Sequence, residues 1–300
     1  MSSLHLPRGT LGPALVERSR HALACGAMQP VETTEEIVPD AGVDFIVRRV
    51  SGLERKERAK EQNTRASPPA NPFLPHEPDL FVADLSDTHF ALLNKYNVIE
   101  RHLLILTRAF VHQEMLLDAR DFEALAMCMA EVEGLGIYNG GAVAGASQPH
   151  KHLQLVPLPL DRAGSRLPME ALFGSVIRRS GVVQVPGLPF RHALSGLDHI
   201  AFGDTAAAWQ LHACYLELLA AVGLKAAGTG GEVRQSGPYN FLATRRWMLL
   251  VPRSTERFES ISVNALGFAG SLFVRDAARL SLLKRAGPMS VLRGSAFALA

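Results

Sequence analysis

Two histidines and a glutamine alternate along one short stretch of the sequence, GASQPHKHLQLVPLP at residues 145–159. Successive side chains of a β-strand point to opposite faces, so residues two apart line one face with neighbours roughly 6.5–7 Å apart. The spacing therefore predicts a row made of His150, His152 and Gln154 on one face of a strand. The other face takes the residues between them, which are Lys151, Leu153 and Leu155.

Three interpretations of this row compete. The histidines can be hydrogen-bonded polar groups at a sheet edge. They can hold a metal ion together with a third ligand, although no suitably placed Cys, Asp or Glu adjoins the row in the sequence. One of them can also be a nucleophile, because a neutral imidazole with a pKa near ~6.5 attacks phosphorus without a partner base.

The segment before the row, YNGGAVAGASQP, favours the third interpretation. Glycines let backbone N–H groups approach phosphate oxygens closely, and a loop of this kind running into the histidine strand brings donors and nucleophile to one anion. The glycines are Gly140, Gly141 and Gly145, and neutral side-chain donors come from Asn139, Ser147 and Gln148.

The loop and the histidine row together resemble the signature of a known family. GGAVAGASQPHKHLQ is similar to the active-site signature of the diadenosine polyphosphate phosphorylases, also called ATP adenylyltransferases, of the histidine-triad superfamily. Galactose-1-phosphate uridylyltransferases share the H-x-H-x-Q motif, but no metal-binding cysteine pair here points to them. Further similar blocks follow the family's order, so that the resemblance spans roughly residues 40–276, at 71–108, 186–193, 240–254 and 263–274.

The resemblance implies an α+β, HIT-like fold and reversible phosphorolysis of diadenosine tetraphosphate (Ap4A) to ATP and ADP. His152 would carry the adenylyl group, His150 would orient the ring of His152 and fix its tautomer, and Gln154 would contact the α-phosphate. An amide at position 154 donates a hydrogen bond but cannot shuttle protons, which suits an acceptor that is already anionic, such as phosphate. A divalent cation, Mg²⁺, would be bound through the polyphosphate, with no metal site built from the protein's own residues.

The resemblance also assigns substrate contacts. Lys56 is taken from the basic run at 55–60, Arg275 stands where the family has lysine, and Ser271 stands where it has a larger apolar residue. The full set is Lys56, Asn94, Lys95, Asn139, Gly145, Ala146, Ser147, Gln148, Gln154, Asn264, Ala265, Leu266, Ser271 and Arg275. Two alternatives stay open: a hydrolase of the same superfamily that uses water as acceptor, and a nucleotide sensor that binds dinucleotide without turnover. The intact H-x-H-x-Q motif argues against the sensor.

The amino-acid composition limits the kinds of partner that the protein is expected to bind. The chain has 31 basic and 29 acidic residues, a net charge of +2, and 47% apolar residues, which describes an ordinary globular protein without a coat of charge for nucleic acid. Its three cysteines form no CxxC pair, so disulfides and cysteine-based zinc sites are not expected and a reducing compartment fits. We expect a cytoplasmic protein without signal peptide or membrane span. Its ligands would be small molecules (Ap4A, ATP, ADP and phosphate), and it would be a monomer or homodimer.

The elements that must position the row do not alternate one strand to one helix, which favours an antiparallel sheet with flanking helices. Two regions are expected in one globular unit, a catalytic one at 1–165 and a C-terminal one at 185–300. Asp121 is expected to cap a helix. Other helices are expected at 11–26 and 204–222, and strands at 43–50, 79–85, 89–98, 101–108 and on both sides of a turn near Arg245.

Overall fold

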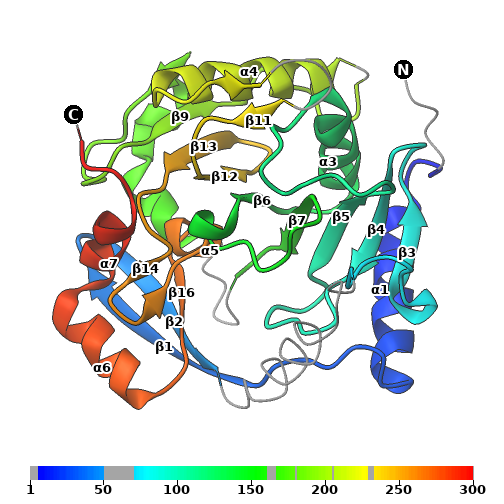
Figure 1. Cartoon of the computed structure of the whole chain (residues 1–300), viewed down its shortest axis with the longest axis horizontal. Coiled ribbons are helices and arrows are strands. Elements are labelled where there is room, and N and C mark those ends of the chain that lie inside the picture. The colour runs from blue at the N-terminus through cyan, green and yellow to red at the C-terminus, as the bar shows by residue number, and fades with distance from the viewer. Residues whose placement is uncertain are drawn as a thin grey trace.

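A nine-stranded sheet forms the centre of the protein, which is described here as a computed structural model (Figure 1). The structure describes residues 6–50, 71–160, 167–179, 181–204, 206–228 and 233–299. Each strand of the central sheet is antiparallel to its neighbours, as expected. In spatial order the strands are β3 (Phe81–Asp84), β4 (His89–Leu93), β5 (Leu103–Thr107), β7 (His152–Pro157), β6 (Gly134–Gly140), β12 (Tyr239–Ala243), β13 (Trp247–Pro252), β9 (Ala193–Gly196) and β8 (Val182–Val183).

Strands from both predicted regions share this sheet. Strand β6 pairs with β7 on one side and with β12 on the other, with Asn139 opposite Asn240. A smaller sheet of β1 (Thr33–Asp40), β2 (Val43–Val50) and β16 (Ser271–Val274) contains a parallel pair, β2 with β16. Two short antiparallel pairs are β10 (Ala226–Ala227) with β11 (Arg234–Gln235), and β14 (Arg257–Phe258) with β15 (Ile261–Ser262).

Helices cover one face of the central sheet. Figure 1 shows α4 and α3 along one side of it and α1 beside β3 and β4, while α5, α6 and α7 gather with the smaller sheet. The helices are α1 (Leu11–Ala24), α3 (Ala119–Glu131), α4 (Ala207–Ala221), α5 (Ala265–Phe268), α6 (Ala277–Ala286) and α7 (Pro288–Ser295). The 3₁₀ turns are η1 (Pro78–Leu80), η2 (Ala142–Ala144), η3 (Pro168–Leu172) and η4 (Gly174–Arg178). None of the helices in the described ranges is both long and apolar enough to cross a membrane.

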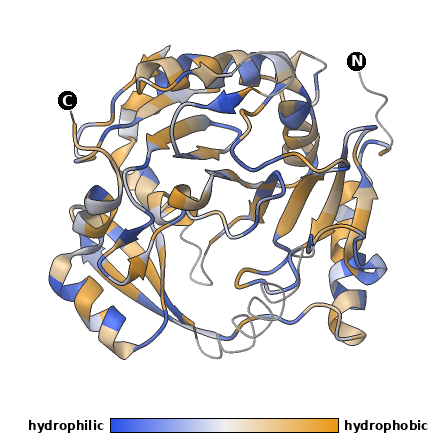
Figure 2. Cartoon of the chain, in the orientation of Figure 1, coloured by the Kyte–Doolittle hydropathy of each residue, from blue (hydrophilic) through white to orange (hydrophobic). Residues whose placement is uncertain are grey.

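Two large apolar cores lie on opposite faces of the sheet, and the strands are correspondingly hydrophobic in Figure 2. Strand β7 alternates between the faces: Leu153 and Leu155 belong to the core under α3 and α4, whereas His152 and Gln154 face a cleft on the other side. The predicted row was wrong for His150, which precedes β7 and does not line the cleft. Trp247 is buried in the second core, in agreement with its apolar surroundings in the sequence.

The prediction that Asp121 caps a helix was wrong by one turn. Asp118 is the N-cap of α3 and accepts hydrogen bonds from the backbone N–H groups of Arg120 and Asp121. The Asp121 carboxylate in turn accepts a hydrogen bond from the backbone N–H of Asp118, which completes a capping box. Two acidic residues three apart both suit a helix start, and only the backbone pairing decides between them.

Candidate active site

A cleft of about 890 Å³ opens on the β4–β5–β7 part of the central sheet, near the upper end of the roughly 300–1,000 Å³ of small-molecule sites. Its far wall comes from the segment between β14 and α6. Among the described residues that line it, the charged side chains are four cations and two carboxylates, namely Lys95, Arg257, Arg275, Arg279, Glu77 and Glu256. This balance favours an anionic ligand.

His152 presents one nitrogen to this cleft. Its ring is 5% exposed and lies against Phe73, with ring centroids 5.3 Å apart. Its Nδ1 lies 2.8 Å from the backbone carbonyl oxygen of His150. A carbonyl oxygen only accepts hydrogen bonds, so Nδ1 carries the proton and Nε2 keeps its lone pair. Burial lowers the pKa of His152 to about 4, so that the ring is neutral at pH 7.

His150 acts through its backbone and not through its ring. The ring is fully buried, and its Nε2 lies 2.9 Å from the carbonyl oxygen of Thr107 while its Nδ1 lies 2.9 Å from the side-chain amide of Asn71. The ring does not line the cleft. The group of His150 that holds the His152 ring is therefore its backbone carbonyl oxygen.

A third imidazole, His102, sets the orientation of the Gln154 amide. Its Nε2 lies 2.9 Å from Oε1 of Gln154, and its Nδ1 lies 3.3 Å from the side-chain amide nitrogen of Asn94. If Nε2 donates to Oε1, the NH₂ group of Gln154 is left for the cleft, where it can donate to a phosphate oxygen. Sequence reasoning missed His102, although the alternating strand 101–108 would place it on the same face as Leu104.

Gln113 holds the start of β7 in place where its pairing with β6 ends. The β6–β7 pairing ends at Ile137 opposite Gln154, so the backbone of His152 has no β6 partner. The buried side chain of Gln113 takes this place. Its Oε1 accepts from the His152 N–H at 2.9 Å, and its Nε2 donates to the carbonyl oxygens of Asn139 at 3.0 Å and His152 at 3.3 Å. No local pattern in the sequence signals this role.

The opposite wall is tied to β6 through Asn139. Its Oδ1 accepts from the side-chain amide of Asn240 at 2.8 Å and from the backbone N–H of Ala265 at 2.9 Å. Asn264 caps α5 by accepting from the N–H of Leu266 at 3.0 Å. The N–H groups of Ala265 and Leu266 are engaged in these bonds. The side chains of Asn139 and Asn264 therefore fix the position of this wall of the cleft.

The glycine-containing loop that follows β6 packs directly against the cleft wall that contains Asn264. Gly145 has φ 91°, and a Cβ there would lie 2.8 Å from Cβ of Asn264, so both its conformation and its surroundings require glycine. The N–H groups of Gly145 and Ala146 donate to the carbonyl oxygens of Ala142 and Gly141 within the loop. Ser147 and Gln148 are the next loop residues along the cleft lining.

The buried Arg253 binds residues next to the cleft wall that Asn139 and Asn264 form. Arg253 donates to Oδ1 of Asn240 at 2.6 Å and to the carbonyl oxygen of Val263 at 2.8 Å. It also donates to the carbonyl oxygens of Ser295 and Thr255. Desolvation lowers the pKa of Arg253 to about 10, which leaves it charged at neutral pH. Sequence reasoning did not single it out, because one arginine at a strand end has no local signature.

The structure brings most of the predicted contact residues to the cleft. Those that line it are Asn94, Lys95, Asn139, Gly145, Ala146, Ser147, Gln148, His152, Gln154, Asn264, Leu266 and Arg275. Lys95 also forms an ion pair with Glu77, with Nζ 2.7 Å from Oε1. Lys56 falls outside the described residues.

Two predicted substrate contacts lie behind the cleft. Ala265 is fully buried and takes part through its bond to Asn139. Ser271 is fully buried at the start of β16, where its hydroxyl accepts from the guanidinium of the buried Arg48. Neither residue is part of the cleft lining. The small side chain at position 271 leaves room for Arg48, which explains locally why a larger apolar residue is absent there.

The fold and the cleft together define an α+β protein that presents a strand histidine to a large cleft. The chain belongs to the Ap4A phosphorylase family. Residues 1–175 match the Ap4A phosphorylase N-terminal domain, and residues 186–298 match the ATP adenylyltransferase C-terminal domain.

Relatives of known function are distant in sequence but similar in fold. The chain is 25% identical over 213 residues to diadenosine 5',5'''-P1,P4-tetraphosphate phosphorylase 2 of Saccharomyces cerevisiae, a match that covers 64% of each protein. It is 22% identical over 259 residues to the protein APA1 of the same yeast, which covers 82% of this chain and 80% of the relative. The crystal structure of yeast Ap4A phosphorylase Apa2 in complex with Ap4A superposes with a TM-score of 0.77 at 21% identity, over 99% of both chains. The shared fold confirms the predicted HIT-like, mainly antiparallel architecture.

Proposed function

We propose that the protein phosphorolyses diadenosine tetraphosphate to ATP and ADP, reversibly, with His152 as the nucleophile. The observation that carries the proposal is the state of one ring: neutral, locked with its proton on Nδ1, and facing a cationic cleft. Family membership supports the same activity, and two of the yeast proteins that the chain resembles are Ap4A phosphorylases by name.

The proposed reaction transfers the adenylyl group in two steps, first to His152 and then to phosphate. Nε2 of His152 attacks an α-phosphorus, a P–N bond forms, and the P–O bond to the departing ATP breaks. Inorganic phosphate then attacks the same phosphorus, the P–N bond breaks, and ADP leaves while Nε2 recovers its lone pair. Charge on the equatorial oxygens is stabilised by positioned donors, a role suited to the Gln154 amide and to the cations of the far wall.

Mg²⁺ fits this site as a companion of the substrate. The two carboxylates in the described cleft lining are already engaged, Glu77 with Lys95 and Glu256 with Arg257. Hard divalent cations prefer oxygen ligands and often keep several waters. We therefore propose that the ion is held through the polyphosphate oxygens and neutralises part of their charge.

Trapping the labelled intermediate tests the proposal. Wild-type protein given Ap4A labelled in the α-phosphate, without phosphate, should retain AMP in a bond that is stable to base and labile to acid. His152→Asn should lose this label and at least about 10⁴-fold in turnover, the scale expected when a nucleophile is removed. The proposal fails if His152→Asn still carries label, or if free AMP accumulates steadily without phosphate, which would identify a hydrolase.

His192 supplies a matched control. It is also a buried histidine whose Nδ1 bonds the carbonyl oxygen two residues before it, Phe190, at 2.7 Å. Its Nε2 accepts from the N–H of Val185 at 2.8 Å and faces no cleft. His192→Asn should therefore keep the AMP label and the turnover number.

A further inference from the structure

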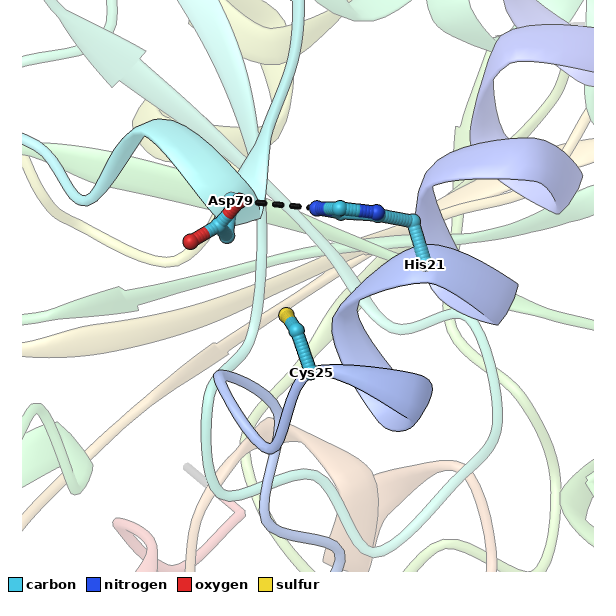
Figure 3. A group of neighbouring side chains, drawn as sticks. All are labelled: His21, Cys25 and Asp79. Atoms are coloured by element: carbon cyan, nitrogen blue, oxygen red, sulfur yellow. Dashed lines mark hydrogen bonds and ion pairs between the residues drawn. The ribbon is translucent and has the colours of Figure 1, made fainter.

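Away from the cleft, three side chains with metal-binding atoms meet where the end of α1 faces η1 (Figure 3). His21 lies in the last turn of α1, Cys25 follows the helix as its C-cap, and Asp79 comes from η1. Their ring nitrogen, sulfur and carboxylate oxygen all lie within 4.8 Å of one another. Within the described ranges, no other group of three such residues comes this close together.

The chemistry of the three atoms selects a particular class of ion. A cluster of carboxylates attracts any cation by charge, but here a single carboxylate joins an imidazole and a thiol. Nitrogen and thiolate sulfur suit Zn²⁺ and similar borderline-soft ions, whereas Mg²⁺ and Ca²⁺ prefer oxygen ligands. The set therefore differs in kind from any site for a polyphosphate-bound magnesium ion.

The geometry needs only small adjustments. Metal–ligand bonds of about 2.0–2.3 Å at tetrahedral angles place ligand atoms roughly 3.3–3.8 Å apart. Nε2 of His21 and Oδ1 of Asp79 are 2.7 Å apart, and the sulfur of Cys25 points toward this pair in Figure 3. An ion would separate the first two atoms and draw the sulfur closer by about 1 Å or less. All three residues are exposed, so these rotations disturb no core packing.

We propose that His21, Cys25 and Asp79 bind one Zn²⁺ or a similar borderline-soft divalent ion, with water as the fourth ligand. His21 binds through its neutral Nε2 while Nδ1 carries the proton. Cys25 binds as thiolate, and its proton is released to solvent. The i, i+4 spacing of His21 and Cys25 puts both on one side of the helix end, a pattern that a search for CxxC pairs does not detect.

The bound ion would join the end of α1 to η1, which adjoins the cleft. Asp79 lies between Glu77 and Leu80, both of which line the cleft. Glu77 in turn pairs with Lys95. A metal bridge from α1 to η1 would tether this part of the wall more firmly than the His21–Asp79 contact does by itself, because that contact is exposed to solvent screening.

Cobalt titration of the full-length protein tests the site directly. The protein is freed of metal, kept reduced with a phosphine, and titrated with Co²⁺, which reports thiolate ligation by a charge-transfer band in the near ultraviolet. We expect one equivalent to bind with this band, and Zn²⁺ to displace the cobalt. Cys25→Ser should abolish the band. His21→Ala and Asp79→Asn should weaken binding by at least the roughly 10- to 100-fold that loss of an outer-shell partner costs.

Two exposed neighbours in the sequence serve as controls, since His199→Ala and Asp198→Asn remove the same groups elsewhere. Both should bind cobalt as the wild type does. In a second measurement, Zn²⁺ should slow alkylation of Cys25, which is exposed whereas Cys128 and Cys214 are buried, and His21→Ala should remove this protection. The site is refuted if cobalt binds without the band, if the band survives in Cys25→Ser, or if Zn²⁺ leaves the alkylation rate unchanged. None of these readouts depends on adenylyl transfer.

Discussion

His152 and His192 have nearly the same local arrangement, but only His152 lines the cleft. Each is buried, and each has its Nδ1 within 2.8 Å of the carbonyl oxygen two residues earlier. Burial lowers the pKa of both rings. They differ in what Nε2 meets: the N–H of Val185 for His192, and the cleft for His152. A locked, neutral imidazole is therefore found both at the cleft and away from it, and the surroundings of one nitrogen lone pair distinguish the two histidines.

A buried ion pair lies just before β7, on the side of the sheet away from the cleft. Lys151 forms an ion pair with Asp121, whose carboxylate also accepts from His89 at 3.1 Å. Burial alone would raise the pKa of Asp121, but Lys151 and His89 bring it down to about 2. Neighbouring residues at the start of β7 thus hold a paired charge on one side of the sheet and an uncharged imidazole on the other, because partners on one side offset the cost of desolvation.

The largest expected effect comes from breaking that pair. Lys151→Met leaves Asp121 buried without its cation, which should lower the free energy of unfolding by about 3–5 kcal/mol. Urea denaturation of Lys151→Met and His152→Asn checks this, with the second variant expected to lose far less. Equal losses in the two variants would contradict this prediction, because the ion pair would then contribute no more to stability than the His152 ring does.

A smaller effect is expected when His152, the proposed nucleophile, is kept but shifted in position. Gln113→Met takes away the bonds that hold the His152 backbone and Asn139 together, and a shift of about 1 Å at a reacting group costs on the order of 10²-fold in rate. We expect the rate of adenylyl-histidine formation to fall by about this factor, with the Kd for AMP changing far less. Single-turnover kinetics and equilibrium binding measure the two quantities.

Tyr215→Phe is the control for this substitution. It breaks a buried hydroxyl pair with Tyr239 in the helix-covered core, away from the cleft. It should cost some stability and leave the rate of transfer unchanged. A parallel loss of rate in both variants, or an equal loss of AMP affinity and rate in Gln113→Met, would mean that Gln113 only stabilises the fold.

The smallest expected effect is the pH dependence of nucleophile loading. The pKa of His152 is about 4, so the ring stays neutral and the single-turnover rate should be nearly flat from about pH 8 to about pH 5.5. Stability behaves differently. The folded pKa lies below the unfolded value near ~6.5, so the unfolded chain takes up the proton first. The free energy of unfolding should fall between about pH 6.5 and pH 4, and this fall should be smaller in His152→Asn. A fall in the loading rate centred near pH 6.5 would contradict the buried, neutral state of the ring.

Residues close together in the sequence were the most predictable. The alternation of His152, Leu153 and Gln154 between two faces followed from strand geometry, and the wall behind the loop needs glycine at position 145. The partners that position these groups were not predictable. Gln113 lies 39 residues from His152, and His102 lies 52 residues from Gln154, so their contacts exist only after the sheet has formed.

Within β7 the sequence by itself determined which side chains share a face, because a strand's two-residue period is a property of the backbone. It also determined the family, through motifs whose order spans most of the chain. Only the tertiary structure decided that the His150 ring turns inward, that Ser271 accepts from Arg48, and that His152 and not His192 meets a cleft. The reason is that burial, pKa and hydrogen-bond partners depend on atoms brought together from distant parts of the chain, and local spacing carries no record of them.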